Sequence, residues 1–235
     1  MKTADKYDKQ LVVEFQTGGA DPIIVNSSIE LAKAFSKLKG IPGLSTVTSW
    51  NSNDVIGPAA GSNWTAMRSA MDELSDESRV YLNGHGDWES QTISGLGPKD
   101  VAKLLFLTKM PSVKTLCVTA CGLGRLKTKK GLIFNSVSSF ATKLHAKLKE
   151  DYYIRCEVHA YVLDMGVYTQ DTLDKFGMSD QKLILGRKYT SREEVVDGKA
   201  HHGAVFHRQQ SKIILSWAGN KQVTTQVLYE KSGGI

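Results

Sequence analysis

The chain has 235 residues, 41% of them hydrophobic, and its 30 basic and 24 acidic residues give a net charge of +6, which favours anionic partners. This length suffices for one substantial core, argues against two domains, and includes no apolar run near the roughly 20 residues of a membrane-spanning helix. No secretory signal is visible at the amino terminus, and three cysteines without a C-x-x-C pair disfavour a zinc site and favour a reducing compartment.

Strands and helices are predicted to alternate along the first half of the chain. Strand predictions rest on short β-branched and apolar runs that end at glycine or polar residues, and helix predictions rest on apolar residues that share one face. In chain order, these elements are a strand at Gln10–Phe15, a helix carrying Ile29, Ala32 and Phe35, a loop or insertion from Trp50 to Asn63, a helix carrying Met67, Met71 and Leu74, and a strand at Arg79–Asn83.

The same alternation continues to about residue 163. The elements are a helix carrying Val101, Leu104 and Leu105, a strand at Val113–Ala120, a helix carrying Ile133, Val137, Phe140, Ala141 and Leu144, and a strand at Ile154–Leu163. Strands that alternate with crossover helices favour an α/β fold with a mostly parallel sheet and helices on both faces. After Leu163 the pattern changes to glycine-separated strands, including Ile213–Trp217 and Gln222–Tyr229. We expect one domain, with a core at about 7–165 and an antiparallel C-terminal flap at about 180–235.

Two of the predicted strands end in the same way, with a reactive side chain beside glycine. The strand at Arg79–Asn83 runs into Gly84-His85-Gly86, and the strand at Val113–Ala120 runs into Cys121-Gly122. Because a helix lies between them, we expect the two strands to be parallel neighbours joined by a right-handed crossover. Their carboxyl ends then share the edge where α/β sheets form ligand clefts, so His85 and Cys121 should meet there.

This pairing suits nucleophilic catalysis. A free thiol has a pKa of about 8.5, so His85 would act as base for Cys121 and then protonate the leaving amine. Gly86 and Gly122 let the backbone approach a substrate and are the predicted oxyanion-site residues, with the amides of Gly86 and Cys121 available as donors. No third catalytic residue is evident. Three aspartates precede the histidine strand and could orient His85, and sequence does not choose among Asp54, Asp72 and Asp76.

A structural interpretation competes for each residue taken alone. A single cysteine at a strand end is more often a small core residue, and a single histidine more often lies on the surface or caps an element. The equivalent placement of both residues at two strand ends favours the catalytic interpretation. Cys117 and Cys156 lie within apolar strands and are predicted to be packed, inert thiols.

The residues around this pair resemble a known family. G-H-G after one strand and A-C-G after the next is similar to the caspase-like clan of cysteine peptidases. More specifically, the chain resembles the cysteine protease domain of MARTX and large clostridial toxins, which inositol hexakisphosphate activates. The resemblance covers most of the chain and rests on KYDKQLVVEF, RVYLNGHGDWESQTISGLGPKDVAKLL, VTACGL, K-K-G at Lys129–Gly131, GRKYT and SKIILSW.

The resemblance implies a caspase-like core with a C-terminal β-flap and an autoprocessing activity. Members of the family cleave the toxin chain near the domain after inositol hexakisphosphate binds a basic pocket. The implied protein is therefore a secreted bacterial toxin or effector that acts in the host cytosol. Its polypeptide substrate would be its own parent chain or a host protein.

Charge is concentrated in a basic stretch that could bind this ligand. From Lys182 to Lys212 there are seven basic and three acidic residues, which supply +4 of the net +6. Converging Lys and Arg donors relieve the repulsion between clustered phosphates. By resemblance, the candidate ligand-binding residues are Arg187, Lys188 and Lys212, followed by Lys199, Arg208 and Lys130.

This stretch has three other interpretations, one purely structural and two that involve another ligand. It could be a solvated basic hairpin. Nucleic acid is disfavoured because few aromatic residues, Tyr189 and Phe206, lie among the basic ones. A metal site at His201, His202 and His207 is disfavoured because their spacing matches no standard zinc site.

Two departures from the family leave alternatives open. Ala120 precedes the nucleophile where glycine is usual, and little sequence precedes the first strand, so the chain is either an excised domain or a stand-alone effector. The alternative functions are a peptidase or acyltransferase independent of inositol phosphate, and a catalytically silent polyanion-binding module.

Overall fold

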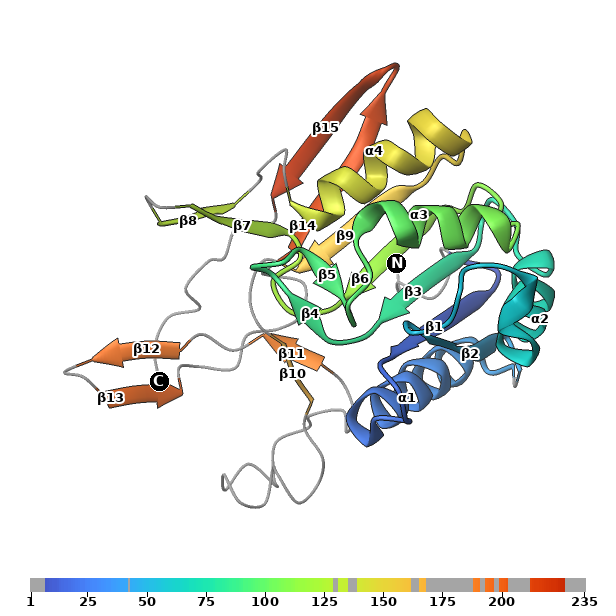
Figure 1. Cartoon of the computed structure of the whole chain (residues 1–235), viewed down its shortest axis with the longest axis horizontal. Helices are drawn as coiled ribbons and strands as arrows, with labels where there is room; N and C mark the ends of the chain where they lie inside the picture. The colour runs from blue at the N-terminus through green and yellow to red at the C-terminus, as the bar shows by residue number, and fades with distance from the viewer. Residues whose placement is uncertain are drawn as a thin grey trace.

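The computed structural model describes residues 7–41, 43–128, 131–134, 139–161, 165–167, 188–190, 193–196, 199–202 and 212–226. The strands of its central sheet are β1 (Gln10–Gln16), β2 (Ser45–Asn51), β3 (Arg79–Asn83), β6 (Thr115–Thr119), β9 (Glu157–Tyr161), β14 (Lys212–Ala218) and β15 (Lys221–Gln226). They lie in the order β15-β14-β9-β6-β3-β1-β2 (Figure 1). Within this sheet β1, β2, β3, β6 and β9 are mutually parallel, whereas β14 pairs antiparallel with β9 and β15 pairs antiparallel with β14. The predicted α/β class with a mostly parallel sheet is confirmed.

Within the described ranges, four α-helices connect or flank these strands. They are α1 (Pro22–Lys39), α2 (Ser62–Asp72), α3 (Pro98–Leu107) and α4 (Phe140–Tyr152), and a short 3-10 helix, η2, covers Pro58–Ala60. Asp21 caps the amino end of α1 and Pro22 follows at its first turn, whereas Gly40 ends it in a left-handed conformation with φ 69°. Among the described helices, none is long and apolar enough to cross a membrane.

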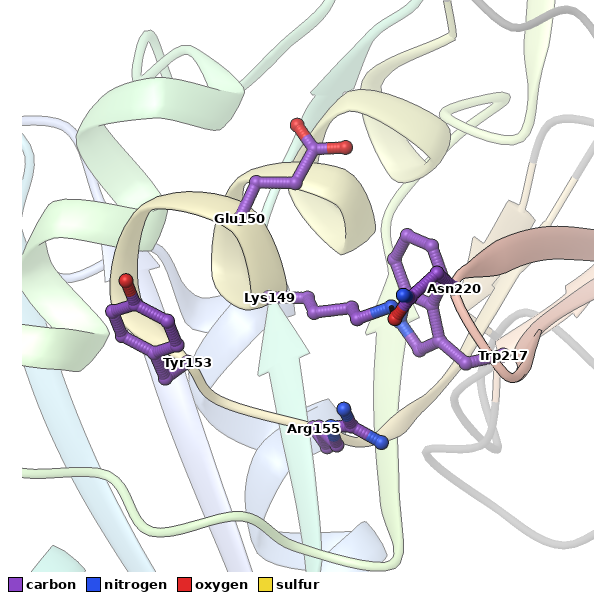
Figure 2. A pocket seen from close by; sticks show the side chains of 6 residues that line it. All are labelled: Lys149, Glu150, Tyr153, Arg155, Trp217 and Asn220. Carbon is purple, nitrogen blue, oxygen red and sulfur yellow. Dashed lines mark hydrogen bonds between the residues drawn. The ribbon is translucent and has the colours of Figure 1, made fainter.

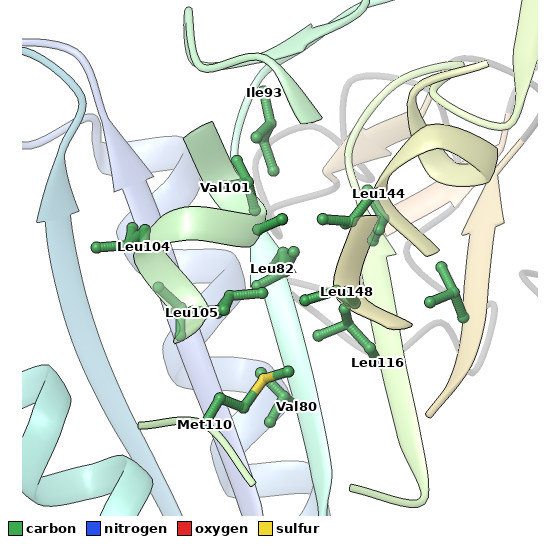
Figure 3. Close-up of a cluster of buried hydrophobic side chains, with 14 of the residues drawn as sticks. Val80, Leu82, Ile93, Val101, Leu104, Leu105, Met110, Leu116, Leu144 and Leu148 are labelled. Carbon is green, nitrogen blue, oxygen red and sulfur yellow. The ribbon is translucent and has the colours of Figure 1, made fainter. Parts of the chain in front are cut away.

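The helices cover both faces of the sheet, as expected. Helices α2, α3 and α4 pack on one face around the larger apolar cluster, and α1 packs on the other face (Figure 1). Figure 3 shows the centre of the larger cluster, where Val80, Leu82 and Leu116 of the sheet meet Leu104, Leu105, Leu144 and Leu148 of the helices. Burying each such leucine contributes about 1.5–3 kcal/mol. The strands that lead to the candidate site are therefore held by the larger of the two apolar clusters of the described residues.

The strand order reverses direction at β1. The chain first moves from β1 to β2 at one edge, then returns to β3 on the other side of β1 and continues outward to β6 and β9. With right-handed crossovers, the connection through α1 lies on the face opposite to those through α2, α3 and α4. The carboxyl ends of β1 and β3 therefore flank a topological switch point, where open α/β sheets form their ligand crevices.

Most predicted elements are present, with four corrections. The helix predicted to carry Met67, Met71 and Leu74 ends at Asp72, so Leu74 lies beyond it. The strand β2 was not predicted, because it is mostly polar and has only two large apolar residues, Val47 and Trp50. The loop predicted from Trp50 to Asn63 is wrong at both ends, since β2 includes Trp50 and α2 begins at Ser62. The helix predicted to include Ile133 is also wrong there: Ile133 lies in a strand, α4 begins at Phe140, and Val137 lies outside the described residues.

The remaining described strands form antiparallel pairs. They are β4 (Gly86–Asp87) with β5 (Thr92–Ile93), β7 (Arg125–Thr128) with β8 (Gly131–Phe134), β10 (Met165–Val167) with β11 (Lys188–Thr190), and β12 (Glu193–Val196) with β13 (Lys199–His202). Strand β14 pairs with β9 and so extends the central sheet. Residues 227–229 of the last predicted strand lie outside the described residues, and the boundary between core and flap stays a prediction.

Candidate active site

His85 and Cys121 lie at equivalent positions beyond two adjacent parallel strands. In the register of β3 and β6, Asn83 is level with Thr119, and each of the two candidate residues follows two positions later. The prediction that these strands are parallel neighbours is confirmed. The two loops also touch, because a Cβ placed on Gly86 would lie 2.5 Å from Cys121 N and closer still to Cys121 O. The histidine and cysteine loops are thus in backbone contact at one edge of the sheet.

Glycine is required on both sides of His85. A Cβ on Gly84 would lie 2.8 Å from Ser94 Oγ, closer than real Cβ contacts essentially ever come, and 3.0 Å from Phe15 Cβ, which is tighter than nine in ten real Cβ contacts. The Gly86 position is occluded by the backbone of Cys121, which is less able to move than a side chain. These glycines allow close approach of neighbouring chain segments. For Gly86, the sequence predicted close approach of a substrate; the structure shows close approach of the Cys121 backbone.

Ser94 holds the backbone of His85 in place. His85 N donates a hydrogen bond to Ser94 Oγ (3.2 Å), and Ser94 N donates to His85 O (2.7 Å). The hydroxyl of Ser94 in turn donates to Phe15 O (2.8 Å) at the end of β1. Ser94 therefore joins the loop of His85 to the end of β1, which is distant in sequence, and this fixes the path of the chain at His85.

The imidazole of His85 contacts a carboxylate that the sequence analysis missed. His85 Nε2 lies 2.7 Å from Asp21 Oδ2, and Asp21 Oδ1 accepts hydrogen bonds from the amides of Ile23 (2.7 Å) and Ile24 (3.4 Å). Asp21 therefore caps α1 with one oxygen and binds His85 with the other. The hydrogen bond from His85, followed by those from the helix amides, lowers the pKa of Asp21 below its ordinary value. An ionised Asp21 is further favoured by the amino end of the helix.

The three aspartates considered from sequence lie elsewhere. Asp54 accepts a hydrogen bond from Asn63 Nδ2 (3.4 Å), Asp72 is the last residue of α2, and Asp76 precedes the amino end of β3. His85 follows the carboxyl end of β3, so Asp76 lies at the wrong end of the strand. A sequence signal for Asp21 did exist, because Asp-Pro shortly after a strand is typical of the start of a helix. Only the strand order, however, reveals that β1 adjoins β3 and so brings Asp21 near His85.

A buried polar network ties α1 to the strands beneath the site. The Asn83 side chain is fully buried and donates hydrogen bonds to Ile24 O (3.2 Å), Ser27 Oγ (2.8 Å) and Ser28 Oγ (2.6 Å). Thr119 Oγ1 lies 3.3 Å from Asn83 Oδ1 and so connects β6 to the same group. Because α1 carries Asp21 at its start, this network sets where that carboxylate meets His85.

The amino end of α4 holds both loops from the other face. Phe140 N donates to Gln91 Oε1, and Gln91 Nε2 donates to Trp88 O (2.5 Å) in the hairpin after His85. The next helix amide, Ala141 N, donates to Leu123 O (3.1 Å) in the loop after Cys121. The first amides of a helix have no partners within the helix. Here they fasten the histidine and cysteine loops to the same helix end.

Exposure distinguishes Cys121 from the other cysteines. Cys121 is half-buried, whereas Cys117 and Cys156 are buried, as expected. Burial raises the pKa of the Cys156 thiol to about 12. The His85 side chain is 61% exposed, and Asp21 is 35% exposed. Cys121 is therefore the one cysteine of the described part of the chain that is not buried.

The two predicted oxyanion residues are both in positions that favour glycine, for different reasons. Gly122 has φ 61°, in the left-handed region, and Gly86 lies against Cys121 as described. Their role in stabilising an oxyanion stays a prediction.

The side chains of the predicted phosphate-binding residues all lie outside the part of the chain that the structure describes. Arg187, Arg208 and Lys130 lie outside the described residues. Lys188, Lys199 and Lys212 lie in strands β11, β13 and β14, without a description of their side chains. His201 and His202 lie in β13 in the same way, and His207 is outside. Among the described residues, no three His, Cys, Asp or Glu side chains gather as metal ligands.

In comparisons with known proteins, no family model and no curated protein sequence matches the chain. The resemblance to toxin cysteine protease domains therefore stays a prediction carried by the motifs quoted above. The geometry around His85 and Cys121 stands independently of it.

Proposed function

We propose that the chain is a cysteine endopeptidase with Cys121 as nucleophile and His85 as base and acid. The observation that carries this proposal is the contact of two glycine-flanked loops in which both residues follow level positions of parallel neighbouring strands. The edge is the one at which α/β sheets bind ligands, and it lies beside the switch point between β1 and β3. An accessible thiol beside a histidine is the arrangement that acyl-enzyme chemistry needs.

Asp21 determines which nitrogen of His85 faces the reaction. An ionised carboxylate only accepts hydrogen bonds, so His85 Nε2 carries the proton in the neutral ring and Nδ1 carries the lone pair. Nδ1 is then the atom that takes the proton of the Cys121 thiol. Asp21 also stabilises the imidazolium that results, and so acts through His85 rather than on the substrate.

The reaction would proceed in two stages. The Cys121 thiolate attacks the peptide carbonyl, a C–S bond forms, and the oxyanion is held by backbone amides near Gly86 and Cys121. His85 passes its proton to the amine as the C–N bond breaks. Water, deprotonated by His85, then attacks the acyl-enzyme and releases the acid, and the proton returns to the sulfur.

We further propose that inositol hexakisphosphate activates this site from a distance and that the enzyme processes its own parent chain. The support is the basic stretch from Lys182 to Lys212 together with the resemblance. Activation requires that the ligand bind the active conformation more tightly than the inactive one, since equal affinity shifts no population.

Cleavage of a denatured protein substrate, with and without inositol hexakisphosphate, tests the nucleophile. Wild type should cleave, Cys121→Ala should lose activity by about ten-thousandfold or more, and the matched Cys156→Ala variant should retain it. Activity that survives in Cys121→Ala would refute the assignment.

Thermal melting of the Cys121→Ala variant separates binding from catalysis. Tight binding of inositol hexakisphosphate to the folded chain must raise the melting midpoint. A raised midpoint with an inactive wild type would favour a silent polyanion-binding module. An active wild type without any shift would favour a peptidase or acyltransferase independent of inositol phosphate.

A further inference from the structure

A cavity of about 390 Å³ lies at the end of the molecule opposite Cys121. It is lined by the last turn of α4, the loop that follows it, and the turn between β14 and β15, with the lining residues Lys149, Glu150, Tyr153, Arg155, Trp217 and Asn220 (Figure 2). Arg155 N bonds Ser112 Oγ (3.0 Å), just before β6 begins, whereas Cys121 follows the end of β6. The cavity therefore lies at the amino edge of the parallel strands and is separate from the candidate active site. Its volume is within the range of small-ligand sites.

One wall of the cavity is built by Lys149. Its Nζ donates to Gly219 O (3.3 Å) and Asn220 Oδ1 (3.2 Å) and lies 3.9 Å from the centroid of the Trp217 ring. Trp217 also packs on the buried His145, with ring centroids 4.7 Å apart. The β14–β15 turn is thus fastened to α4, and this wall is formed before any ligand binds.

The opposite wall carries groups that nothing else in the described part of the chain engages. The guanidinium of Arg155 has no acidic partner there, and Tyr153 is 86% exposed. Tyr153 ends α4 with φ 59°, a left-handed conformation that aromatic residues rarely adopt and that directs the chain toward Arg155. In Figure 2 Arg155 lies below Lys149, and Glu150 points away from Arg155.

The charges of the lining select a class of ligand. Lys149 and Arg155 contribute two positive charges and Glu150 one negative charge, which suits a single carboxylate and not a cluster of phosphates. The guanidinium fork of Arg155 matches a carboxylate in two parallel hydrogen bonds. The exposed ring of Tyr153 offers an apolar surface beside it, and the amide of Asn220 can bond a peptide backbone.

We propose that this cavity binds an acidic peptide segment. One Asp or Glu carboxylate of the segment binds Arg155, and a neighbouring apolar side chain packs on Tyr153. Such a site would hold a polypeptide at a distance from the cleft at Cys121, whatever reaction occurs there. The proposal does not rest on the peptidase assignment.

The test is a titration of the Cys121→Ala chain with two blocked peptides, Ac-Ala-Phe-Glu-Ala-NH2 and its Gln counterpart. The reporter is the indole N–H resonance of Trp217, assigned with Trp217→Phe; this N–H is buried and has no hydrogen-bond partner in the described part of the chain. The Glu peptide should shift this resonance saturably, and the Gln peptide should bind about tenfold more weakly or worse. Arg155→Gln should weaken the Glu peptide by a similar factor.

Lys147→Gln is the matched control, because it also removes one positive charge near the cavity. Lys147 lies on α4, is paired with Asp151 and is not part of the cavity lining. It should leave binding of the Glu peptide unchanged. Equal binding of the two peptides, no shift with either, or an equal loss in Lys147→Gln and Arg155→Gln would overturn the proposal. Displacement of the peptide by equimolar inositol hexakisphosphate would overturn it too, since the cavity would then be a phosphate site.

Discussion

The two edges of the central sheet each carry a cysteine and a histidine. At the carboxyl edge, Cys121 is half-buried and His85 is exposed beside the carboxylate of Asp21. At the amino edge, Cys156 is 8% exposed and His145 is 1% exposed, and His145 Nε2 bonds Cys156 O (3.1 Å).

Burial gives the second pair opposite properties to those that catalysis needs. It raises the pKa of the Cys156 thiol to about 12 and lowers the pKa of His145 to about 4, so both are neutral at pH 7. Gln222 Nε2 lies 2.8 Å from His145 Nδ1, which fits a neutral ring that accepts there and donates to Cys156 O. The comparison therefore predicts that exposure and a charged partner, not residue type, separate a reactive pair from a structural one.

Labelling the thiols is the most direct test of the difference between the two cysteine–histidine pairs. Iodoacetamide at pH 7.5 should modify Cys121 at least about a thousandfold faster than Cys156, because a buried thiol in a stable domain reacts only through rare opening. Peptide mass spectrometry after timed quenching measures both rates. Comparable rates in the folded protein would show that the two edges do not differ in reactivity.

Replacing the carboxylate partner of His85 should have the next largest effect. In Asp21→Asn the amide can still cap α1 with its oxygen, but its N–H donates to His85 Nε2 and favours the wrong ring tautomer. We expect kcat to fall by about a thousandfold with a small change in KM. Asp54→Asn, at a carboxylate bonded to Asn63, is the control and should be fully active. Similar activity in the two variants would remove Asp21 from the mechanism.

A methyl group between the two loops should have a somewhat smaller effect. Gly86→Ala forces the loops apart, since its Cβ would overlap the backbone of Cys121, and a displacement of about 1 Å costs about a hundredfold in rate. Gly97→Ala is the matched control, because its Cβ would meet Asp100 Oδ2 at 3.9 Å and its φ is −75°. Kinetics of peptide cleavage and a melting curve should be measured for both. A fully active Gly86→Ala enzyme would contradict the loop contact.

The smallest expected effect is the contribution of the buried His145 to the pH dependence of the free energy of unfolding. The unfolded chain binds a proton at His145 below about pH 6.5, whereas the folded chain does so only below about pH 4. Stability contributed by neutral His145 is therefore lost as pH falls between these values, by about 2 kcal/mol at pH 5. Urea unfolding at pH 7.5 and pH 5 should show this loss in wild type. In His145→Gln the difference between the two pH values should shrink by that amount, and an unchanged difference would contradict a buried neutral ring.

Local sequence patterns were sufficient for the strands that carry the site. Gly84-His85-Gly86 and Cys121-Gly122 follow runs of buried residues, and burial on both faces of a parallel strand leaves a continuous apolar signal. The same rule explains the failure at β2, an edge strand with only Val47 and Trp50 as large apolar residues, where polar positions are tolerated.

The sequence by itself determined the α/β class, the two central strands and the placement of a histidine and a cysteine just beyond their ends, because these depend on short-range periodicity and on glycine. Only the tertiary structure decided that Asp21, 64 positions before His85, is its partner. The physical reason is strand order: the chain reverses direction at β1, so that the start of α1 and the end of β3 meet at a switch point that no local pattern encodes.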